Sequence, residues 1–315
     1  MAGYDEAHTR AAFYRVPAPG YLRIGGADQR DFIQRQTTND VRLLTPERAL
    51  LTALTSGTAR ILDVWRLVMD ADAIGVITLP GRGAATEQYL RTRIFFMDKV
   101  TVASEEIAQI EVVGPAAGDA LQAVGLPALP EPDQVVTIQA NGGSLRGIGL
   151  IGRGWLLLTP AGSVEALIER LAPRAAALDS ATYETLRVEG GLPGPARELT
   201  QDYTPLEATL DGAISGDKGC YSGQEVIARQ ITYDKIARRM AGLRLDAPVT
   251  VGAAVQAGGR SAGEITSAVE SPRFGAIALA VLRRPHFEPG TAITVTGADG
   301  GLIAGETVAL PFESS

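Results

Sequence analysis

Apolar and polar positions along the first 170 residues follow two periods, one of about two residues and one of about 3.6. The period of two predicts strands at Tyr21–Ile24, Ile61–Met69, Ile74–Leu79, Ile107–Val113, Val135–Ile138, Leu145–Ile151 and Trp155–Thr159. The longer period predicts helices from the N-cap Asp28 to Gln36 and over Gly83–Arg93, Pro115–Val124 and Ser163–Leu171. Because strands and helices alternate in this way, the sequence predicts an α+β fold.

The pattern changes from Leu243 onward. Short apolar segments follow one another at even spacing, separated by Gly, Pro, Asp and Ser. Such spacing is typical of a small barrel or sandwich. We therefore expect a domain of residues 1–240, ending after a helical stretch that includes Ile236–Arg239, and a β domain of residues 241–315.

Composition narrows the class of protein. The 315 residues are enough for about two domains, and 45% apolar with 21% charged residues is a globular balance. The net charge of −7 argues against direct nucleic-acid binding, and the longest apolar runs are too short for a membrane span. The N-terminus lacks the features of a secretory signal. The single cysteine, Cys220, excludes a multi-cysteine metal site built by this chain alone and points to a reducing, cytoplasmic location.

Glycines at 147, 149 and 152 match the dinucleotide-binding pattern. That pattern requires a strand before it and a helix after it, whereas a strand-like run, Trp155–Leu158, follows here. We therefore interpret Gly147–Gly152 as part of a β-hairpin.

The segment Lys218–Glu225 holds the most informative chemistry. Its glycines allow a tight path of the backbone, and a helix is predicted to begin near Gly223. Cys220 then lies just ahead of a helix N-terminus and two residues from Lys218, and both positive charges favour a thiolate. A reactive thiol or transient metal ligand is one interpretation. The other is a small buried apolar side chain, the usual environment of a free cysteine.

Basic residues are in excess between Lys218 and Arg244, with six basic and two acidic side chains. This stretch could hold a small polyanion or an RNA backbone, or it could be a solvated helix face.

Two carboxylates are further candidates for a site. Glu189 lies at a predicted helix end beside Gly190 and could accept hydrogen bonds from a planar heterocycle such as a pterin, or it could be structural. Asp63 shares one face of its predicted strand with apolar side chains, so we expect it to be partly buried.

Taken together, these motifs resemble one family. Lys218–Glu225 resembles the K-G-C-Y-x-G-Q-E signature of the YgfZ proteins, folate-binding relatives of the glycine cleavage T-protein, an aminomethyltransferase. Further segments resemble family elements in the expected order: Gln36–Val41, Arg60–Asp63, Leu186–Gly191, Thr204–Leu210 and Gly263–Ala268.

The resemblance implies a ring of α+β folate-binding subdomains followed by a C-terminal β-barrel, with tetrahydrofolate or a derivative as ligand. It implies that Glu189 recognises the pterin and that Cys220 is the characteristic cysteine. The implied folate-binding residues also include Lys218, Tyr221, Gln224 and Arg229. The implied function is assistance in iron-sulfur cluster assembly or repair, together with assembly proteins or client enzymes, which would indirectly support tRNA-modifying iron-sulfur enzymes.

The sequence also departs from the T-proteins. They carry a paired-acid strand, whereas Val64 follows Asp63 here, and Ala59 replaces the glycine before Arg60. This difference favours an accessory role. One alternative is a folate-dependent one-carbon transferase or demethylase, with Asp63 or Asp40 as acid/base and Glu189 as pterin anchor. Another is a binding module without folate, in which Cys220 only packs.

Overall fold

The computed structural model describes residues 1–315 except 128–130, 141–142, 151–153, 234, 299 and 314–315. The chain forms two compact units. Unit 1 consists of residues 1–54, 63–182 and 212–222, and unit 2 of residues 55–62, 183–211 and 223–315. The domains expected from the sequence, 1–240 and 241–315, divide the chain differently from these two units, and that division stays a prediction.

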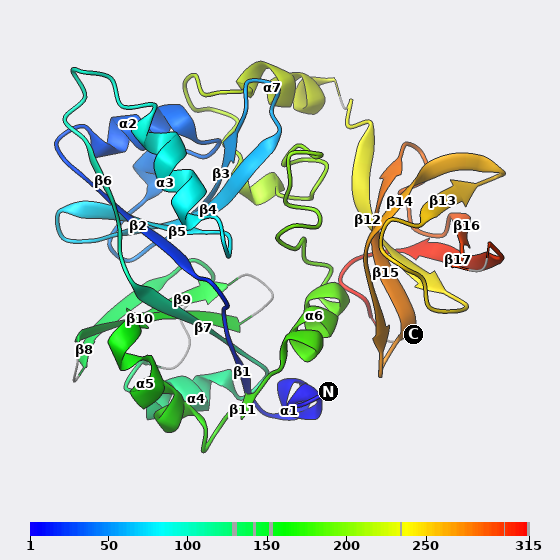
Figure 1. Ribbon diagram of the computed structural model, residues 1–315, viewed down its shortest axis with the longest axis horizontal. Coiled ribbons are helices and arrows are strands. Elements are labelled where there is room, and N and C mark those ends of the chain that lie inside the picture. The colour runs from blue at the N-terminus through cyan, green and yellow to red at the C-terminus, as the bar shows by residue number, and fades with distance from the viewer. Residues whose placement is uncertain (128–130, 141–142, 151–153, 234, 299, 314–315) are drawn as a thin grey trace. The chain divides into compact units, whose positions relative to one another are not determined.

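The first sheet of unit 1 has five strands in the order β3-β4-β5-β2-β6 (Figure 1). They are β2 (Gly20–Gly25), β3 (Leu50–Thr55), β4 (Ile61–Met69), β5 (Ala73–Thr78) and β6 (Thr101–Ser104). Helix α2 (Gln29–Gln36) packs on β5, and α3 (Gly83–Arg91) packs on β2 and β6. The short helix η1 (Val41–Leu43) follows α2. The strands and helices predicted for this region are confirmed to within two residues.

The second sheet of unit 1 has six strands in the order β11-β1-β7-β10-β9-β8. They are β1 (Ala12–Arg15), β7 (Ile107–Val113), β8 (Val135–Ala140), β9 (Gly143–Leu150), β10 (Gly154–Pro160) and β11 (Ala176–Ala177). Helices α4 (Ala117–Ala123) and α5 (Val164–Leu171) lie along one face (Figure 1). Because apolar residues recur at helical spacing, α5 buries Val164, Leu167 and Leu171 against this sheet. Helices α1 (Tyr4–Thr9) and η2 (Ala161–Ser163) complete the described elements here.

The two sheets of unit 1 share a core. Tyr21, Val68 and Ile77 of the first sheet pack with Ile148 and Leu156 of the second. Both faces of strands such as β4 are therefore buried, which explains the nearly continuous apolar sequence of this strand.

The glycine-rich segment after residue 146 is part of a β-hairpin, as predicted. Strands β9 and β10 pair antiparallel, with Gly149 opposite Trp155. A side chain at Gly149 would have its Cβ 2.5 Å from the carbonyl oxygen of Glu131, so this glycine serves close packing. Ile151 and Gly152 lie outside the described residues.

Unit 2 contains a closed barrel in the order β12-β15-β14-β13-β16-β17. Its strands are β12 (Arg238–Leu245), β13 (Ala254–Ala257), β14 (Arg260–Ser271), β15 (Gly275–Arg283), β16 (Ala292–Thr296) and β17 (Leu302–Val308). This confirms a barrel rather than a sandwich. The helical stretch predicted at Ile236–Arg239 is wrong, because Arg238 already begins β12 and pairs with Arg283 of β15.

Three further helices are α6 (Ser180–Glu189), η3 (Asp211–Ala213) and α7 (Gln224–Thr232). The helix predicted to begin near Gly223 is thus confirmed. Among the described residues, no helix combines the length and the apolar character needed to cross a membrane.

Candidate functional site

The loop that carries the cysteine is anchored by Lys218. The Lys218 side chain is buried, and its ammonium donates to the carbonyl oxygens of Gln34 (2.8 Å), Thr37 (2.5 Å) and Asn39 (2.7 Å). Three acceptors match the three donors of a lysine, so the buried charge is hydrogen-bonded. Burial nevertheless lowers the pKa of Lys218 from 10.5 to about 8. This ammonium points toward main-chain carbonyl groups of the protein, and its role as a folate ligand stays a prediction.

The turn after α2 forms the other half of this anchor. Thr38 donates its hydroxyl to the carbonyl of Ala213 (2.6 Å) and accepts, through its own carbonyl, the amide of Ser215 (3.0 Å). Asn39 donates to the carbonyls of Leu51 (2.8 Å) and Gly212 (3.2 Å). The Thr-Asn-Asp element found in the sequence therefore holds the segment that leads to the cysteine.

Cys220 is exposed, and Tyr221 beside it is buried. The Tyr221 ring lies 5.2 Å from the Lys218 ammonium, and burial raises the pKa of its phenol to about 12. The side chains of Lys218 and Tyr221 thus point into the protein, and the thiol of Cys220, between them in the sequence, points to solvent. The interpretation of Cys220 as a buried apolar residue is wrong, because the loop turns it to the surface.

Asp40 has little capacity as a base at neutral pH. It accepts hydrogen bonds from Gln34 (3.0 Å) and from the guanidinium of Arg42, whose Nη2 lies 2.7 Å from Oδ2. The hydrogen bonds from Arg42 lower the pKa of Asp40 to about 2. Such a carboxylate is a weak proton acceptor.

Asp63 lies on β4 and is fully buried, not partly buried as expected. Its carboxylate accepts four hydrogen bonds, from the amides of Val64 (2.8 Å) and Leu79 (3.1 Å), the indole of Trp65 (2.9 Å) and the hydroxyl of Thr86. Burial raises the pKa of Asp63, and these donors act in the opposite direction. Two of these donors lie on β4, one directly after β5 and one on α3, and this geometry favours a structural role over that of an acid/base.

Glu189 ends α6 in unit 2. Its carboxylate is buried, and its Oε1 accepts the hydroxyl of Ser271 on β14 at 2.6 Å. Its carbonyl accepts the amide of Phe312 at 2.9 Å. The helix end predicted here is confirmed, and the barrel holds the carboxylate in one orientation.

An ionic network next to Glu189 was not predicted from the sequence. Arg187 is buried and lies 3.5 Å from Glu198, and Ser267 donates to Glu198 at 2.8 Å. Arg187 also donates to Ser267 at 2.7 Å. Arg187 and Ser267 fall in two of the segments that resemble family elements, but nothing in the sequence around Glu198 distinguishes it from a surface glutamate.

The basic stretch is largely neutralised by nearby carboxylates. Arg229 pairs with Glu225 on the exposed face of α7, where both side chains are more than two-thirds exposed. Arg238 pairs with Glu207 (3.0 Å) and Arg239 with Asp211 (2.9 Å). The last two arginines lie on β12, so the interpretation as one solvated helix face is wrong.

The candidate residues therefore fall into two sets. Lys218, Cys220 and Tyr221 lie together in unit 1, and Asp63 lies in the same unit with its own set of partners. Glu189 lies in unit 2, as do Gln224 and Arg229 on α7. Among the described residues, no group of three or more His, Cys, Asp or Glu side chains is arranged to hold a metal ion.

Two family models match the chain, one in its N-terminal part and one in its C-terminal part. Residues 4–218 match the family model described as the GCVT N-terminal domain. Residues 238–313 match the model described as the glycine cleavage T-protein C-terminal barrel domain.

Similar proteins carry three different names. A putative chloroplastic transferase of Arabidopsis thaliana is 30% identical over 90% of this chain and 68% of its own. An aminomethyltransferase of Saccharopolyspora erythraea is 28% identical over 99% of this chain and 89% of its own. The tRNA-modifying protein YgfZ of Edwardsiella ictaluri is 30% identical over 66% of this chain and 63% of its own.

A solved structure has the same fold. The glycine cleavage system aminomethyltransferase T from Bartonella henselae superposes with a TM-score of 0.88, at 23% identity, over 99% of this chain and 88% of its own. The predicted fold class, α+β followed by a C-terminal barrel, is confirmed.

Proposed function

The chain belongs to the glycine cleavage T-protein family, which includes YgfZ, and on this premise we propose that it is a folate-binding accessory protein that assists iron-sulfur cluster assembly or repair. It would then support iron-sulfur enzymes, those that modify tRNA among them, from the cytoplasm. Its partners would be a reduced folate and either assembly proteins or client enzymes.

The observation that carries this proposal is the outward thiol of Cys220. In this loop the side chains of Lys218 and Tyr221 are buried and anchor the backbone, whereas Cys220 is exposed. A single thiolate cannot form a stable cluster site, but it can supply one transient ligand or one redox contact in a complex.

Folate binding is supported by family membership and by Glu189. A buried carboxylate with one oxygen fixed by Ser271 is a suitable acceptor for the paired N–H donors of a pterin. Tetrahydrofolate or a derivative is the proposed ligand.

The accessory role is tested in cells that lack this protein. The activity of a [4Fe-4S] enzyme is measured after re-supply of the wild type, Cys220→Ala or Asp217→Ala. Wild type and Asp217→Ala, an exposed change in the same loop, should restore activity, whereas Cys220→Ala should not. Full rescue by a folded Cys220→Ala would contradict a role for the thiol, and unchanged activity in the deleted cells would contradict the accessory role itself.

A folate-dependent one-carbon transferase is the second candidate, and the aminomethyltransferases that match almost the whole chain favour it. It predicts that the purified protein forms methylene-tetrahydrofolate from an aminomethyl donor and tetrahydrofolate, with release of the amino group as ammonia. The environments of Asp40 and Asp63 argue against it, since one is a very weak base and the other accepts four hydrogen bonds in the core.

A further inference from the structure

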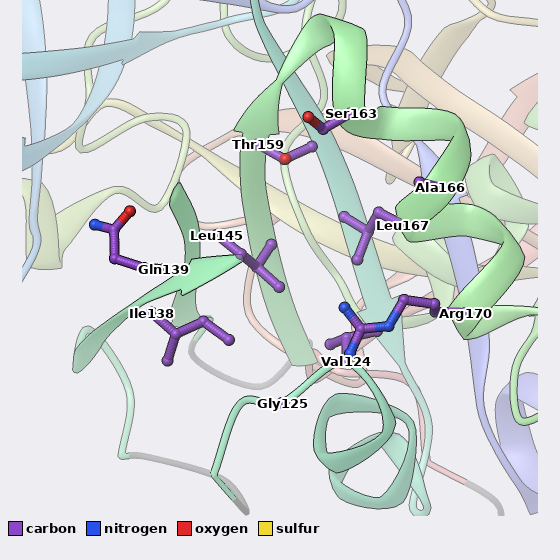
Figure 2. A pocket seen from close by; sticks show the side chains of 10 residues that line it. All are labelled: Val124, Gly125, Ile138, Gln139, Leu145, Thr159, Ser163, Ala166, Leu167 and Arg170. Carbon is purple, nitrogen blue, oxygen red and sulfur yellow. The ribbon is translucent and has the colours of Figure 1, made fainter. Parts of the chain in front are cut away.

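Two features of unit 1 lie outside the sites described above. One is a hollow of about 690 Å³ between α5 and the strands β8 and β9 (Figure 2). Its lining mixes apolar side chains such as Leu145 and Leu167 with polar ones such as Gln139 and Arg170, which fits no single class of ligand. The other feature is the connection between α3 and β6, whose exposed side chains have a more definite chemistry.

Three consecutive apolar side chains face solvent at the tip of this connection. Phe95 is 67%, Phe96 98% and Met97 73% exposed. In Figure 1 the connection extends beyond the end of α3. Isolated exposed apolar residues are common on protein surfaces, whereas a contiguous group of this size marks an interaction site. We call Phe95, Phe96 and Met97 the apolar tip.

Hydrogen bonds hold the backbone of the apolar tip in one turn. The carboxylate of Asp98 accepts the amide of Phe95 at 3.0 Å, and the amide of Asp98 donates to the carbonyl of Phe95 at 2.9 Å. Arg35 on α2 donates to both carboxylate oxygens of Asp98, at 2.9 and 3.0 Å. The next residue, Lys99, donates its amide to Asp28 at 2.8 Å. Because the turn is already ordered, binding through it costs little conformational entropy.

The unpaired charges that adjoin the apolar tip in the sequence are positive. Arg93 and Lys99 lie on either side of it, and both are exposed. Among the described residues, neither forms an ion pair with a carboxylate, whereas Asp98 is paired with Arg35. Local charges dominate at physiological ionic strength, where the Debye length is about 8 Å. An anionic surface therefore complements the tip, although the whole chain has a net charge of −7.

The size of the apolar tip favours a membrane over a protein as its partner. A fully exposed aromatic side chain offers about 150–250 Å², so the three side chains together offer roughly 450 Å². A stable protein interface takes about 800 Å² from each partner. The flanking Thr92, Arg93 and Lys99 are exposed and polar, so they do not extend the apolar area. A bilayer interface needs no matching pocket, and it presents anionic headgroups beside its apolar region.

We propose that the apolar tip is a peripheral contact with an anionic membrane surface. Its three side chains enter the boundary between headgroups and acyl chains, and Arg93 and Lys99 pair with lipid headgroups. The contact is weak and reversible, because three side chains bury far less apolar area than an amphipathic helix does. None of these residues belongs to the sets proposed for folate or for the thiol.

Sedimentation of the purified full chain with lipid vesicles tests this contact. The wild type should bind vesicles of phosphatidylcholine with phosphatidylglycerol, and should bind phosphatidylcholine alone about tenfold more weakly. The double variant Phe95→Ser, Phe96→Ser should bind both kinds of vesicle about tenfold or more weakly than the wild type. Leu302→Ser, which removes a side chain 66% exposed on β17, is the matched control and should bind as the wild type does.

Two further variants separate charge attraction from insertion. The double variant Arg93→Gln, Lys99→Gln should lose the preference for anionic vesicles and keep its binding to phosphatidylcholine. The fluorescence of Phe96→Trp should shift to shorter wavelength with anionic vesicles and be quenched by lipids brominated on their acyl chains. Trp65 and Trp155 are buried, so this change reports on position 96.

Three results would each overturn the proposal. They are absence of wild-type binding to anionic vesicles, an equal loss of binding in Leu302→Ser, and a fluorescence shift of Phe96→Trp that grows with protein concentration without vesicles. The last result would mean that a second copy of the chain covers the apolar tip. Because none of these measurements involves folate or Cys220, failure here leaves the proposed accessory function unaffected.

Discussion

Lys218 and Cys220 are two residues apart, yet one is buried and the other exposed. The sequence placed both in one motif and predicted that the lysine charge would assist the thiol or bind folate. The three carbonyl acceptors at Gln34, Thr37 and Asn39 instead make the lysine an anchor. No sequence pattern distinguishes a lysine that faces solvent from one that closes a turn distant in the sequence, because the acceptors are main-chain atoms.

The anchor predicts a distinct dependence of stability on pH. The folded pKa of Lys218, about 8, is below its unfolded value of 10.5, so the folded state binds fewer protons between these values. The cost of burying the charge is therefore complete below pH 8 and is relieved as the pH rises toward 10.5. We expect the unfolding free energy of the wild type, relative to that of Lys218→Met, to increase between about pH 7 and about pH 10. Urea titration at each pH measures both free energies. A decrease would mean that the carbonyls raise the pKa of this lysine instead.

Asp63 supports a second prediction at the same scale. Asp63→Asn replaces one acceptor oxygen by an amide that faces the Trp65 indole or the Val64 amide, which leaves a buried donor unpaired. The unfolding free energy should fall by about 2 kcal/mol. Asp119→Asn, on the exposed side of α4, should change it by less than about 0.5 kcal/mol. Unchanged stability together with lost one-carbon transfer would instead identify Asp63 as a catalytic residue.

At the scale of elements, the glycines of the Cys220 loop have different tasks. Gly223 precedes α7 with φ +84°, and a Cβ there would lie 2.7 Å from the Cα of Ala59 and the carbonyl oxygen of Ser56. Gly219 has open space around its Cβ position. The backbone conformation thus requires a glycine at 223, whereas Gly219 leaves room beside the thiol of Cys220.

Gly223→Ala should therefore destabilise the protein by at least about 2 kcal/mol, because alanine is strained in the left-handed conformation and its Cβ would clash with backbone atoms. Gly219→Ala is the matched control and should be nearly neutral in the same denaturant titration. Equal effects of the two changes would show that backbone conformation does not distinguish them.

Ala59 explains one departure from the family pattern. It keeps φ +60°, the left-handed conformation that a glycine at this position adopts readily. The alanine that replaces the family's glycine therefore carries local backbone strain.

Elements with strong periodicity could be predicted from the sequence, and those shaped by tertiary contacts could not. Strand β4 is predicted with its observed limits because its sequence is apolar almost throughout, interrupted only by Asp63 and Arg66. The stretch Ile236–Arg239 was predicted as helical because it continues a basic, helix-prone run, but pairing with β15 makes it a strand. Strand β14 was found only through its resemblance to a family element, since glycine, glutamate and hydroxyl side chains interrupt its apolar pattern.

At the scale of the whole molecule, the order of motifs along the chain predicted the family and fold class, and both are confirmed. The environments of the site residues could not be predicted in this way. The network of Arg187, Glu198 and Ser267 joins side chains up to 80 positions apart, and only the folded chain brings them together.

The central claim is that this T-protein fold binds a reduced folate through Glu189. It is tested most directly by calorimetric titration of the full chain with tetrahydrofolate, beside Glu189→Gln and the control Glu306→Gln, which changes an exposed glutamate of β17. Glu189→Gln retains an acceptor for Ser271 but loses the charge that pairs with pterin N–H donors, a loss worth about 1.5–3 kcal/mol. The account predicts binding to the wild type and the control, and affinity about tenfold or more weaker in Glu189→Gln. No binding to the wild type, or equal affinity of the two glutamine variants, would contradict it.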